Sequence, residues 1–495
     1  MISASRDSTP ARSATPPGAV ARLRHWAALP IILAGAFMST LDFFIVNVAI
    51  PSLQQSLHAG AAAIQCVVAG YGLAYAAGLI TAGRLGDRYG RRQVFALGLT
   101  LFTLTSMGCG LAPTATTLVV ARTAQGLAAA LLSPQVLVLL GLLYTGADRA
   151  RAFAAYGLAL GLAAVCGQLI GGALIQANVA GLGWRACFLV NVPLGVAALL
   201  LTPRLIPASR AEGRERLDLV GASLVTLGLV AVVLPLIEGR ELGWPLWTWL
   251  SLAAAAPLLL TFGLIQRRLA ARGGAPLLDL TLFRARAFTV GLLTELVFHA
   301  GMASFFLVLA LYLQQGLGLT ALASGEIFTV LALGFVAASL YAPRLVERWG
   351  RQTLAAGALV MAAGLILLRL TVARLGVGDP SALLAPALLL DGTGMGLVLA
   401  PLTATVLAGL APRHAGAAAG VLTTIQQVAG ALGVALIGLI FYGALRQGGG
   451  AAAYPQAFGA ALLYLIVLAV AVAVLIQLLP RDHNRGAGAS ANATR

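Results

Sequence analysis

The chain has 495 residues, of which 60% are hydrophobic and only 10% charged, and its mean hydropathy is +0.93. A soluble protein carries about 25% charged residues, so the composition excludes a water-soluble globular protein and predicts an integral membrane protein. The formal net charge is +16, and all 32 basic residues are arginines. We interpret this charge as arginine-rich loops that face an anionic membrane leaflet, rather than as a surface that binds nucleic acid.

Apolar runs long enough to cross the hydrocarbon core as helices follow one another along the chain. About 20 apolar residues suffice for one crossing. The pattern predicts an all-α integral membrane protein with fourteen transmembrane helices, near 27–50, 61–83, 93–112, 115–143, 153–177, 186–203, 217–237, 246–266, 287–314, 322–343, 353–373, 382–410, 415–445 and 457–479.

The distribution of arginine indicates the orientation. Residues 1–25 are polar and rich in proline and arginine, which predicts a disordered cytoplasmic tail, and residues 481–495 are predicted to form a second tail. With the N-terminus inside, most arginines fall in the tails and the even-numbered loops. Because positive residues favour the cytoplasmic side, we expect both termini in the cytoplasm and the protein in the cell inner (plasma) membrane.

A charged decapeptide occurs twice. "GRLGDRYGRR" occupies 83–92 and "PRLVERWGRQ" occupies 343–352, an offset of 260 residues and, in the predicted topology, of eight spans. Two six-span halves separated by an inserted pair give this offset. The repeat predicts two pseudo-symmetric six-helix bundles, a common transporter architecture. Their bounds are predicted at 26–203 and 271–480, with a connector and two extra helices at 204–270.

These motifs resemble a known family. "GRLGDRYGRR" is similar to the signature loop of the major facilitator superfamily. Four further segments resemble motifs of its fourteen-span drug:proton antiporter branch: "STLDFFIVNVAIP" (39–51), "RTAQGLAAALLSP" (122–134), "GWRACFLVNVPLG" (183–195) and "AGVLTTIQQVAGALGVA" (419–435).

The resemblance implies a function. It implies a proton-coupled secondary transporter that exports drugs or other amphiphilic, often cationic, small molecules by alternating access. We expect a monomer. The alternative is a metabolite or nutrient transporter on the same fold, because a fold does not fix a function. The sequence has neither a P-loop nor a hydrolase or metalloprotease motif, and its four cysteines lack the spacing of metal ligands. We therefore expect no enzyme activity, no metal and no cofactor besides the proton gradient; the expected partners are the substrate and membrane lipid.

The resemblance also assigns a role to the first charged motif. Asp87 is expected beside the N-terminus of span 13, near Ala415, where unpaired amides carry partial positive charge. This contact would latch the two halves together on the cytoplasmic side. Gly83 is expected to permit close packing and Gly90 to form the turn. Three arginines would bind carboxylates or lipid phosphates, or would only set the topology: Arg88, Arg91 and Arg92.

The fifth span departs from the family pattern. Its glycine motif reads "GQLIGG", with Gln168 where the antiporter branch usually has proline, and this leaves the direction of transport open. Gly167, Gly171 and Gly172 would let neighbouring helices approach closely. Two interpretations of Gln168 stand: a hydrogen bond to a neighbouring helix, or a position on the transport path.

Polar residues inside predicted spans are the candidates for coupling and binding, because such residues are costly in a membrane. They are Asp42, Arg122, Gln125, Glu295, His299 and Asp391. Asp42 is the leading candidate for the proton carrier, and Glu295 and Asp391 are its alternatives in the second half. Arg122 has a structural alternative as the partner of a carbonyl or carboxylate, and His299 as a packing residue.

Overall fold

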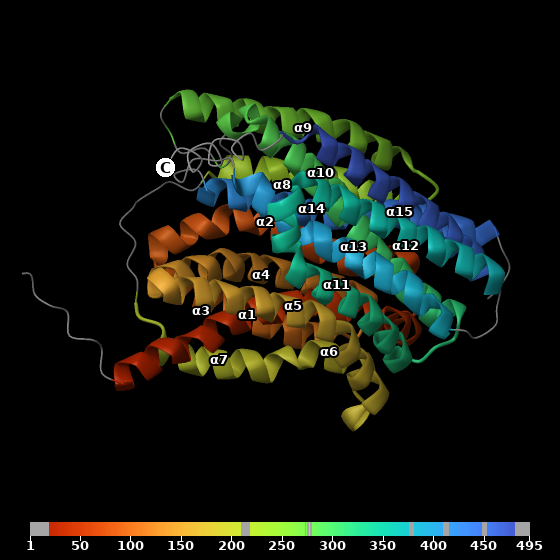
Figure 1. Cartoon of the computed structure of the whole chain (residues 1–495), viewed down its shortest axis with the longest axis horizontal. Helices are drawn as coiled ribbons and strands as arrows, with labels where there is room; N and C mark the ends of the chain where they lie inside the picture. The colour runs from red at the N-terminus through yellow and green to blue at the C-terminus, as the bar shows by residue number, and fades with distance from the viewer. Residues whose placement is uncertain are drawn as a thin grey trace, which may run out of the picture.

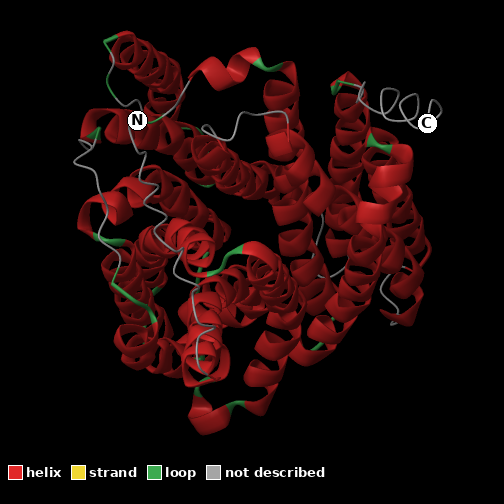
Figure 2. Cartoon of the chain, turned by 60° about the vertical axis from the view of Figure 1, so that its left-hand side comes forward, coloured by secondary structure: helices red, strands yellow, loops and turns green. Residues whose placement is uncertain are grey.

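The computed structural model describes residues 19–208, 218–272, 274, 277, 280–375, 381–408, 415–447 and 453–480. Within these ranges the chain is almost entirely helical and contains no strand (Figure 2). The helices are α1 (Ala19–Leu57), α2 (Ala61–Tyr89), α3 (Arg91–Gly110), α4 (Ala115–Leu143), α5 (Gly146–Ala177), η1 (Val179–Gly181), η2 (Gly183–Arg185), α6 (Ala186–Leu189), α7 (Asn191–Leu205), α8 (Leu219–Glu238), α9 (Leu246–Ala271), η3 (Leu280–Arg284), α10 (Arg286–Leu311), η4 (Tyr312–Gly316), α11 (Ala321–Trp349), α12 (Arg351–Leu375), α13 (Ser381–Ala408), α14 (Ala415–Gln447) and α15 (Ala453–Leu478).

The predicted number of spans is confirmed. Thirteen helical segments of the described chain are long and apolar enough to cross a membrane, and a bent pair within α5 supplies a fourteenth. The two parts of that pair, Arg151–Ala164 and Cys166–Ala177, meet at 41°. The bend lies directly before the glycine motif of the fifth span. A bend therefore forms there without the proline that the family pattern places in this motif.

Two bundles of six spans and an inserted pair make up the fold, as the repeat predicts. Helices α1 to α7 form the first bundle and α10 to α15 the second, and most run along the long axis in Figure 1. The bundles meet where α2 packs against α14 and α5 packs against α11. The repeat is visible in detail: α2 and α11 both have 29 residues, and each ends at a glycine with positive φ, 95° at Gly90 and 58° at Gly350.

Two boundaries differ from the prediction. Helix α1 begins at Ala19, so residues 19–25 belong to the helix rather than to the predicted tail. Their alanine, leucine and arginine residues are strong helix formers, which explains the extension. The charged motif 83–92 is not a long loop, because α2 continues to Tyr89 and α3 begins at Arg91, with only Gly90 between them. Residues 1–18, 209–217 of the predicted connector and 481–495 lie outside the described residues.

The inserted pair α8 and α9 lies on the outside of the junction between the bundles. Helix α8 packs against α2 of the first bundle and α14 of the second, while α9 packs mainly on α8 (Figure 1). Asp218 fixes the start of α8: its carboxylate accepts a hydrogen bond from the amide of Gly221 at 2.8 Å and another from Gln266 of α9 at 2.7 Å. These bonds satisfy a helix N-terminus and tie the two inserted helices together.

The bundles are joined by hydrogen bonds at one end. We call the end at which α1 begins and α15 finishes the terminal end, and the opposite end the far end. At the far end, Gln314 of η4 donates to the carbonyl oxygen of Val48 on α1 at 3.0 Å. Its neighbour Gln315 donates to the side-chain oxygen of Gln54 at 2.6 Å. These contacts hold the far ends of the two halves against each other.

Candidate transport site

The first bundle contains a buried ion pair. Asp42 of α1 is 0% exposed and Arg122 of α4 is 1% exposed, and the guanidinium of Arg122 donates to the carboxylate of Asp42. The remaining capacity of the carboxylate is filled by Gln125, at 2.9 Å, and by Asn191 of α7, at 3.2 Å. Charges taken out of water persist only where they are paired and hydrogen-bonded in this way.

The arginine is fixed from several sides. Its Nε donates to the carbonyl oxygen of Val67 on α2 at 3.2 Å, and its Nη1 also donates to the side-chain oxygen of Gln125 at 2.8 Å. The guanidinium carbon lies 4.3 Å from the centre of the Tyr71 ring, a cation–π contact. Arg122 thus links α1, α2 and α4. Protonation of Asp42 would remove its negative charge and change all of these contacts together.

Sequence reasoning brought Asp42, Arg122 and Gln125 together by residue type, but it missed two members of the cluster. Asn191 bonds Asp42, and Ser106 of α3 accepts hydrogen bonds from Gln125 and from Asn191, both at 3.1 Å. Asn191 lies within the segment 183–195, which resembles a motif of the antiporter branch, so the sequence did contain an indication of its importance. Ser106 is one of several small hydroxyl residues in its span, and nothing in the sequence distinguishes it from its neighbour Thr105.

A second buried carboxylate lies in the second bundle. Glu295 of α10 is fully buried and accepts hydrogen bonds from Thr403 of α13, at 2.9 Å, and from Gln426 of α14, at 3.2 Å. Nδ1 of His299, one turn along α10, lies 3.0 Å from the same carboxylate. The expected pairing of Glu295 with His299 on one helical face is present. Thr403 and Gln426 were not predicted, although Gln426 lies in the quoted segment 419–435.

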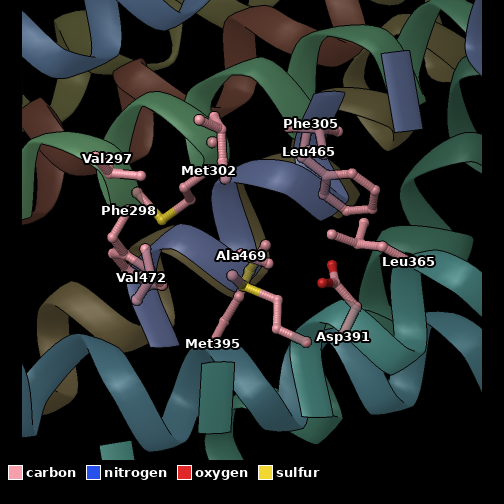
Figure 3. A pocket seen from close by; sticks show the side chains of 13 residues that line it. Val297, Phe298, Met302, Phe305, Leu365, Asp391, Met395, Leu465, Ala469 and Val472 are labelled. Atoms are coloured by element: carbon pink, nitrogen blue, oxygen red, sulfur yellow. The ribbon is translucent and has the colours of Figure 1, made fainter. Parts of the chain in front are cut away.

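Asp391 of α13 stands apart from both clusters. It is completely buried, and neither of its carboxylate oxygens has a hydrogen-bond partner among the described residues. It lines a small cavity together with apolar side chains of α10, α12, α13 and α15 (Figure 3). The structure therefore separates Asp391 from Asp42 and Glu295, with which the sequence analysis grouped it.

The family model described as Major Facilitator Superfamily matches residues 32–434 and, in a second match, residues 292–494. The chain belongs to the major facilitator superfamily. It is 38% identical to the "Probable actinorhodin transporter" of Streptomyces coelicolor, over 85% of this chain and 73% of that protein. It is 40% identical to the "Puromycin resistance protein pur8" of Streptomyces alboniger, over 85% of this chain and 82% of that protein. It is 33% identical to the "Multidrug resistance protein Stp" of Mycobacterium tuberculosis, over 82% of this chain and 74% of that protein.

Solved structures of major facilitator transporters share the fold at low sequence identity. An auto-inhibited peptide transporter of the POT family has a TM-score of 0.67 and 14% identity, covering 93% of this chain and 98% of that one. The xylose transporter XylE from E. coli, in a partially occluded inward-open conformation, has a TM-score of 0.62 and 13% identity, covering 92% of this chain and all of that one. At these identities the likeness concerns the fold alone.

The signature motif of the superfamily has a defined geometry here. Asp87 forms an ion pair with Arg91 across the turn at Gly90. Arg91 also donates to the side-chain oxygen of Gln135 on α4 at 3.3 Å, and a Cβ at Gly86 would lie 2.2 Å from that oxygen. The motif thus fastens the terminal ends of α2 and α3 to α4.

The other predicted members of the motif differ in their surroundings. The close approach expected at Gly83 occurs instead at Gly86, since a Cβ at Gly83 would meet no described atom within 4 Å. Arg92 donates to the carbonyl oxygen of Ile206 at 3.2 Å, whereas Arg88 is exposed beside Tyr89. Residues 409–414, which precede α14, lie outside the described residues, so the latch between Asp87 and α14 stays a prediction.

The fifth-span motif lies where α5 contacts both bundles. Gly167 and Gly171 face α1, since a Cβ at Gly171 would lie 2.6 Å from Val48. Gly172 faces the second bundle, where a Cβ would lie 2.5 Å from the carbonyl oxygen of Ala321 on α11. Gln168 is buried, and its side-chain amide has no hydrogen-bond partner in the described part of the chain. The predicted hydrogen bond to a neighbouring helix is therefore absent in this conformation.

Proposed function

We propose that this protein exports amphiphilic small molecules across the plasma membrane in exchange for protons. The observation that carries the proposal is the fully buried pair of Asp42 and Arg122, in a chain whose relatives are named for antibiotic transport and resistance. Proteins of the major facilitator superfamily are transporters that take small-molecule substrates, and as a class they are not enzymes. The matched puromycin and multidrug resistance proteins support export rather than uptake.

The chemistry of the ion pair suggests how a proton could drive the cycle. In the ionised state, Asp42 holds Arg122 and thereby α1 against α4. When Asp42 takes up a proton, Arg122 is left as a buried cation without its counter-ion. An unpaired charge of this kind is costly, so proton uptake would favour a different arrangement of α1, α2 and α4. The inward proton gradient would then supply the free energy for moving substrate outward.

The aromatic residues near this pair fit an amphiphilic substrate. Phe43 and Phe44 directly follow Asp42 on α1, and the ring of Phe44 lies 5.1 Å from that of Phe306 on α10, across the junction of the bundles. The Phe306 ring stacks in turn on Phe328 of α11 at 5.5 Å. Movement of the bundles would separate the rings of Phe44 and Phe306 and expose them to substrate, where they would favour apolar or cationic groups.

The orientation follows from arginine placement. With the tails and arginine-rich loops in the cytoplasm, the far end faces outward, and the contacts of Gln314 and Gln315 would close the outer side. A single cysteine at position 210, in a cysteine-free background, should be protected from an impermeant thiol reagent added to intact cells. The matched control is a cysteine at the exposed His58, in the far-end turn, which should react. Reaction at position 210 and protection at position 58 would reverse the orientation.

A metabolite or nutrient transporter remains the second candidate, because Gln168 replaces the proline of the antiporter motif. Proteoliposomes distinguish the two. An exporter that exchanges substrate for protons accumulates a drug-like cation inside inverted vesicles only when an inside-acid gradient is imposed, and a symporter does not. Asp42→Asn should abolish this uphill transport. Asp148→Asn, which neutralises an exposed carboxylate paired with Arg151, is the matched control and should transport normally. Full proton-coupled transport by Asp42→Asn would contradict the assignment of Asp42.

A further inference from the structure

The second bundle contains a structural counterpart of the Asp42 site. A Cβ at Gly126 on α4 would lie 2.2 Å from the carbonyl oxygen of Tyr71 on α2, and a Cβ at Gly392 on α13 would lie 2.0 Å from the carbonyl oxygen of Leu331 on α11. Tyr71 and Leu331 are separated by 260 residues, the offset between the two copies of the charged motif. Gly126 and Gly392 therefore occupy equivalent positions in the two bundles.

This equivalence assigns a counterpart to each main residue of the site. Gln125 and Asp391 directly precede the two equivalent glycines, so Asp391 takes the place of Gln125. If the offset of 260 between α2 and α11 is applied to the helices that precede them, α1 and α10, Met302 corresponds to Asp42. Met302 and Asp391 line the same cavity (Figure 3). At this level, the buried carboxyl group therefore lies on the first helix of one bundle, at Asp42, and on the fourth helix of the other, at Asp391.

The surroundings of Asp391 lack the polar partners that Asp42 has. Counted from the same pair of glycines, the counterpart of Arg122 is Leu388, which is buried and apolar. The twelve residues that line the cavity with Asp391 come from α10, α12, α13 and α15 and are apolar or glycine, so no other titratable or charged group of the described chain lines it. The cavity measures about 10 Å³, which is room for about one water molecule.

We propose that Asp391 is a second proton-binding group of this transporter, and that it holds its proton in the conformation described here. An ionised carboxylate without a hydrogen-bond donor or counter-ion is strongly disfavoured in apolar surroundings, whereas the carboxylic acid is tolerated. Asp42 differs because Arg122 neutralises it. Of these two carboxyl groups at equivalent levels of the two bundles, one is therefore ionised and the other protonated.

Release of this proton requires water. When the bundles rearrange and the cavity hydrates, the O–H bond of the Asp391 carboxylic acid breaks and the proton passes to a water molecule, which leaves a solvated carboxylate. Return to the dry conformation requires a proton to be taken up again. The group thereby adds one exchanged proton to each cycle in addition to that of Asp42. This exchange rests on the proposed function, whereas the protonated state in the dry cavity does not.

Infrared difference spectroscopy of the protein in lipid nanodiscs tests the protonated state directly. The carbonyl stretch of a buried carboxylic acid, which shifts on exchange into heavy water, should be present in the wild type at neutral pH. It should be missing from Asp391→Asn and from Asp391→Leu, the latter chosen because an apolar side chain suits the cavity and preserves folding. Asp148→Asn should retain the band. An unchanged band in both Asp391 variants, or no such band in the wild type, would overturn the proposal.

Transport stoichiometry tests the exchange. In proteoliposomes the ratio of protons to substrate, obtained from the gradient that just balances transport, should fall by one in Asp391→Leu, while transport itself persists. An unchanged ratio would overturn the exchange of this proton. A wild type that moves substrate without any proton coupling would contradict the proposed function instead, and the infrared result would still decide whether Asp391 carries a proton.

Discussion

Replacing Arg122 by methionine should strongly destabilise the protein. The substitution removes the counter-ion of Asp42, which is 0% exposed, and leaves a buried carboxylate with only Gln125 and Asn191 as donors. Removing one partner of a buried ion pair costs about 3–5 kcal/mol. The cost arises from the carboxyl group that remains, which must either stay ionised without a counter-ion or be held in the protonated form. It does not arise from the size of the side chain, because methionine fills much of the same volume.

A double-mutant cycle separates these two causes. In Asp42→Asn with Arg122→Met no unpaired charge remains, and the free energy of unfolding should recover by about 2 kcal/mol relative to Arg122→Met alone, within the range of coupling energies for residues in contact. The control pair is Asp148→Asn with Arg151→Met on the exposed start of α5, where an ion pair contributes about 0–1 kcal/mol.

The assay is reversible unfolding in mixed micelles of increasing denaturing detergent, followed by tryptophan fluorescence at fixed protein and lipid content. The midpoint and slope for the four members of each cycle give the coupling energy. Additive effects of the Asp42 and Arg122 substitutions, with no recovery in the double variant, would refute the argument that a buried unpaired carboxylate causes the loss.

Three further predictions concern packing, closure and the signature motif. Gly126→Ala should lower the free energy of unfolding by about 1–3 kcal/mol in the same assay, because the new Cβ collides with the carbonyl oxygen of Tyr71. The control is Gly157→Ala, which has open space around it and should not lower the free energy of unfolding. Equal losses in the two variants would contradict the steric explanation. The side-chain ends of Gln54 and Gln315 are 2.6 Å apart, so cysteines at these two positions, in a cysteine-free background, should be joined by a short bifunctional thiol reagent with a reducible spacer. The crosslink should stop transport until it is reduced, whereas transport by the crosslinked protein would show that the far end need not open. Asp87→Asn should largely abolish transport at normal membrane expression, since the amide loses the ion pair with Arg91 and would weaken the predicted latch to the N-terminus of α14. Wild-type flux at matched expression would exclude an essential charge.

Much of the fold could be predicted because lipid constrains it. A span needs about 20 apolar residues, and charge marks its ends, so the number of spans and the duplicated halves can be derived from composition and one repeated decapeptide. The ends of individual helices were harder to predict than their number. Residues 19–25, and the motif 83–92 apart from Gly90, carry arginines and are nevertheless helical, because helix propensity and a single glycine turn, rather than charge, decide where those helices end.

The site was only partly predictable, for a related reason. A carboxylate within a span is conspicuous, so Asp42, Glu295 and Asp391 could be found in the sequence. The residues that bond these carboxylates depend on which helices pack against each other. Residues close by in the sequence do not reveal that packing. Asp42 lies beside Asn191, 149 residues away, and Glu295 beside Gln426, 131 residues away. The isolation of Asp391 was equally hidden, because it depends on apolar neighbours from three other helices.

The inserted helix α8 has a consequence for any motion of the bundles. It packs against α2 in one bundle and α14 in the other, so it covers the seam along which the two must slide during transport. In a bilayer, apolar helix faces lose little free energy when lipid tails replace protein. Helix α8 can therefore stay in contact with one bundle while the other bundle moves past it, at little cost in free energy. The pair α8 and α9 would thus decide how freely lipid reaches the junction of the bundles from the side.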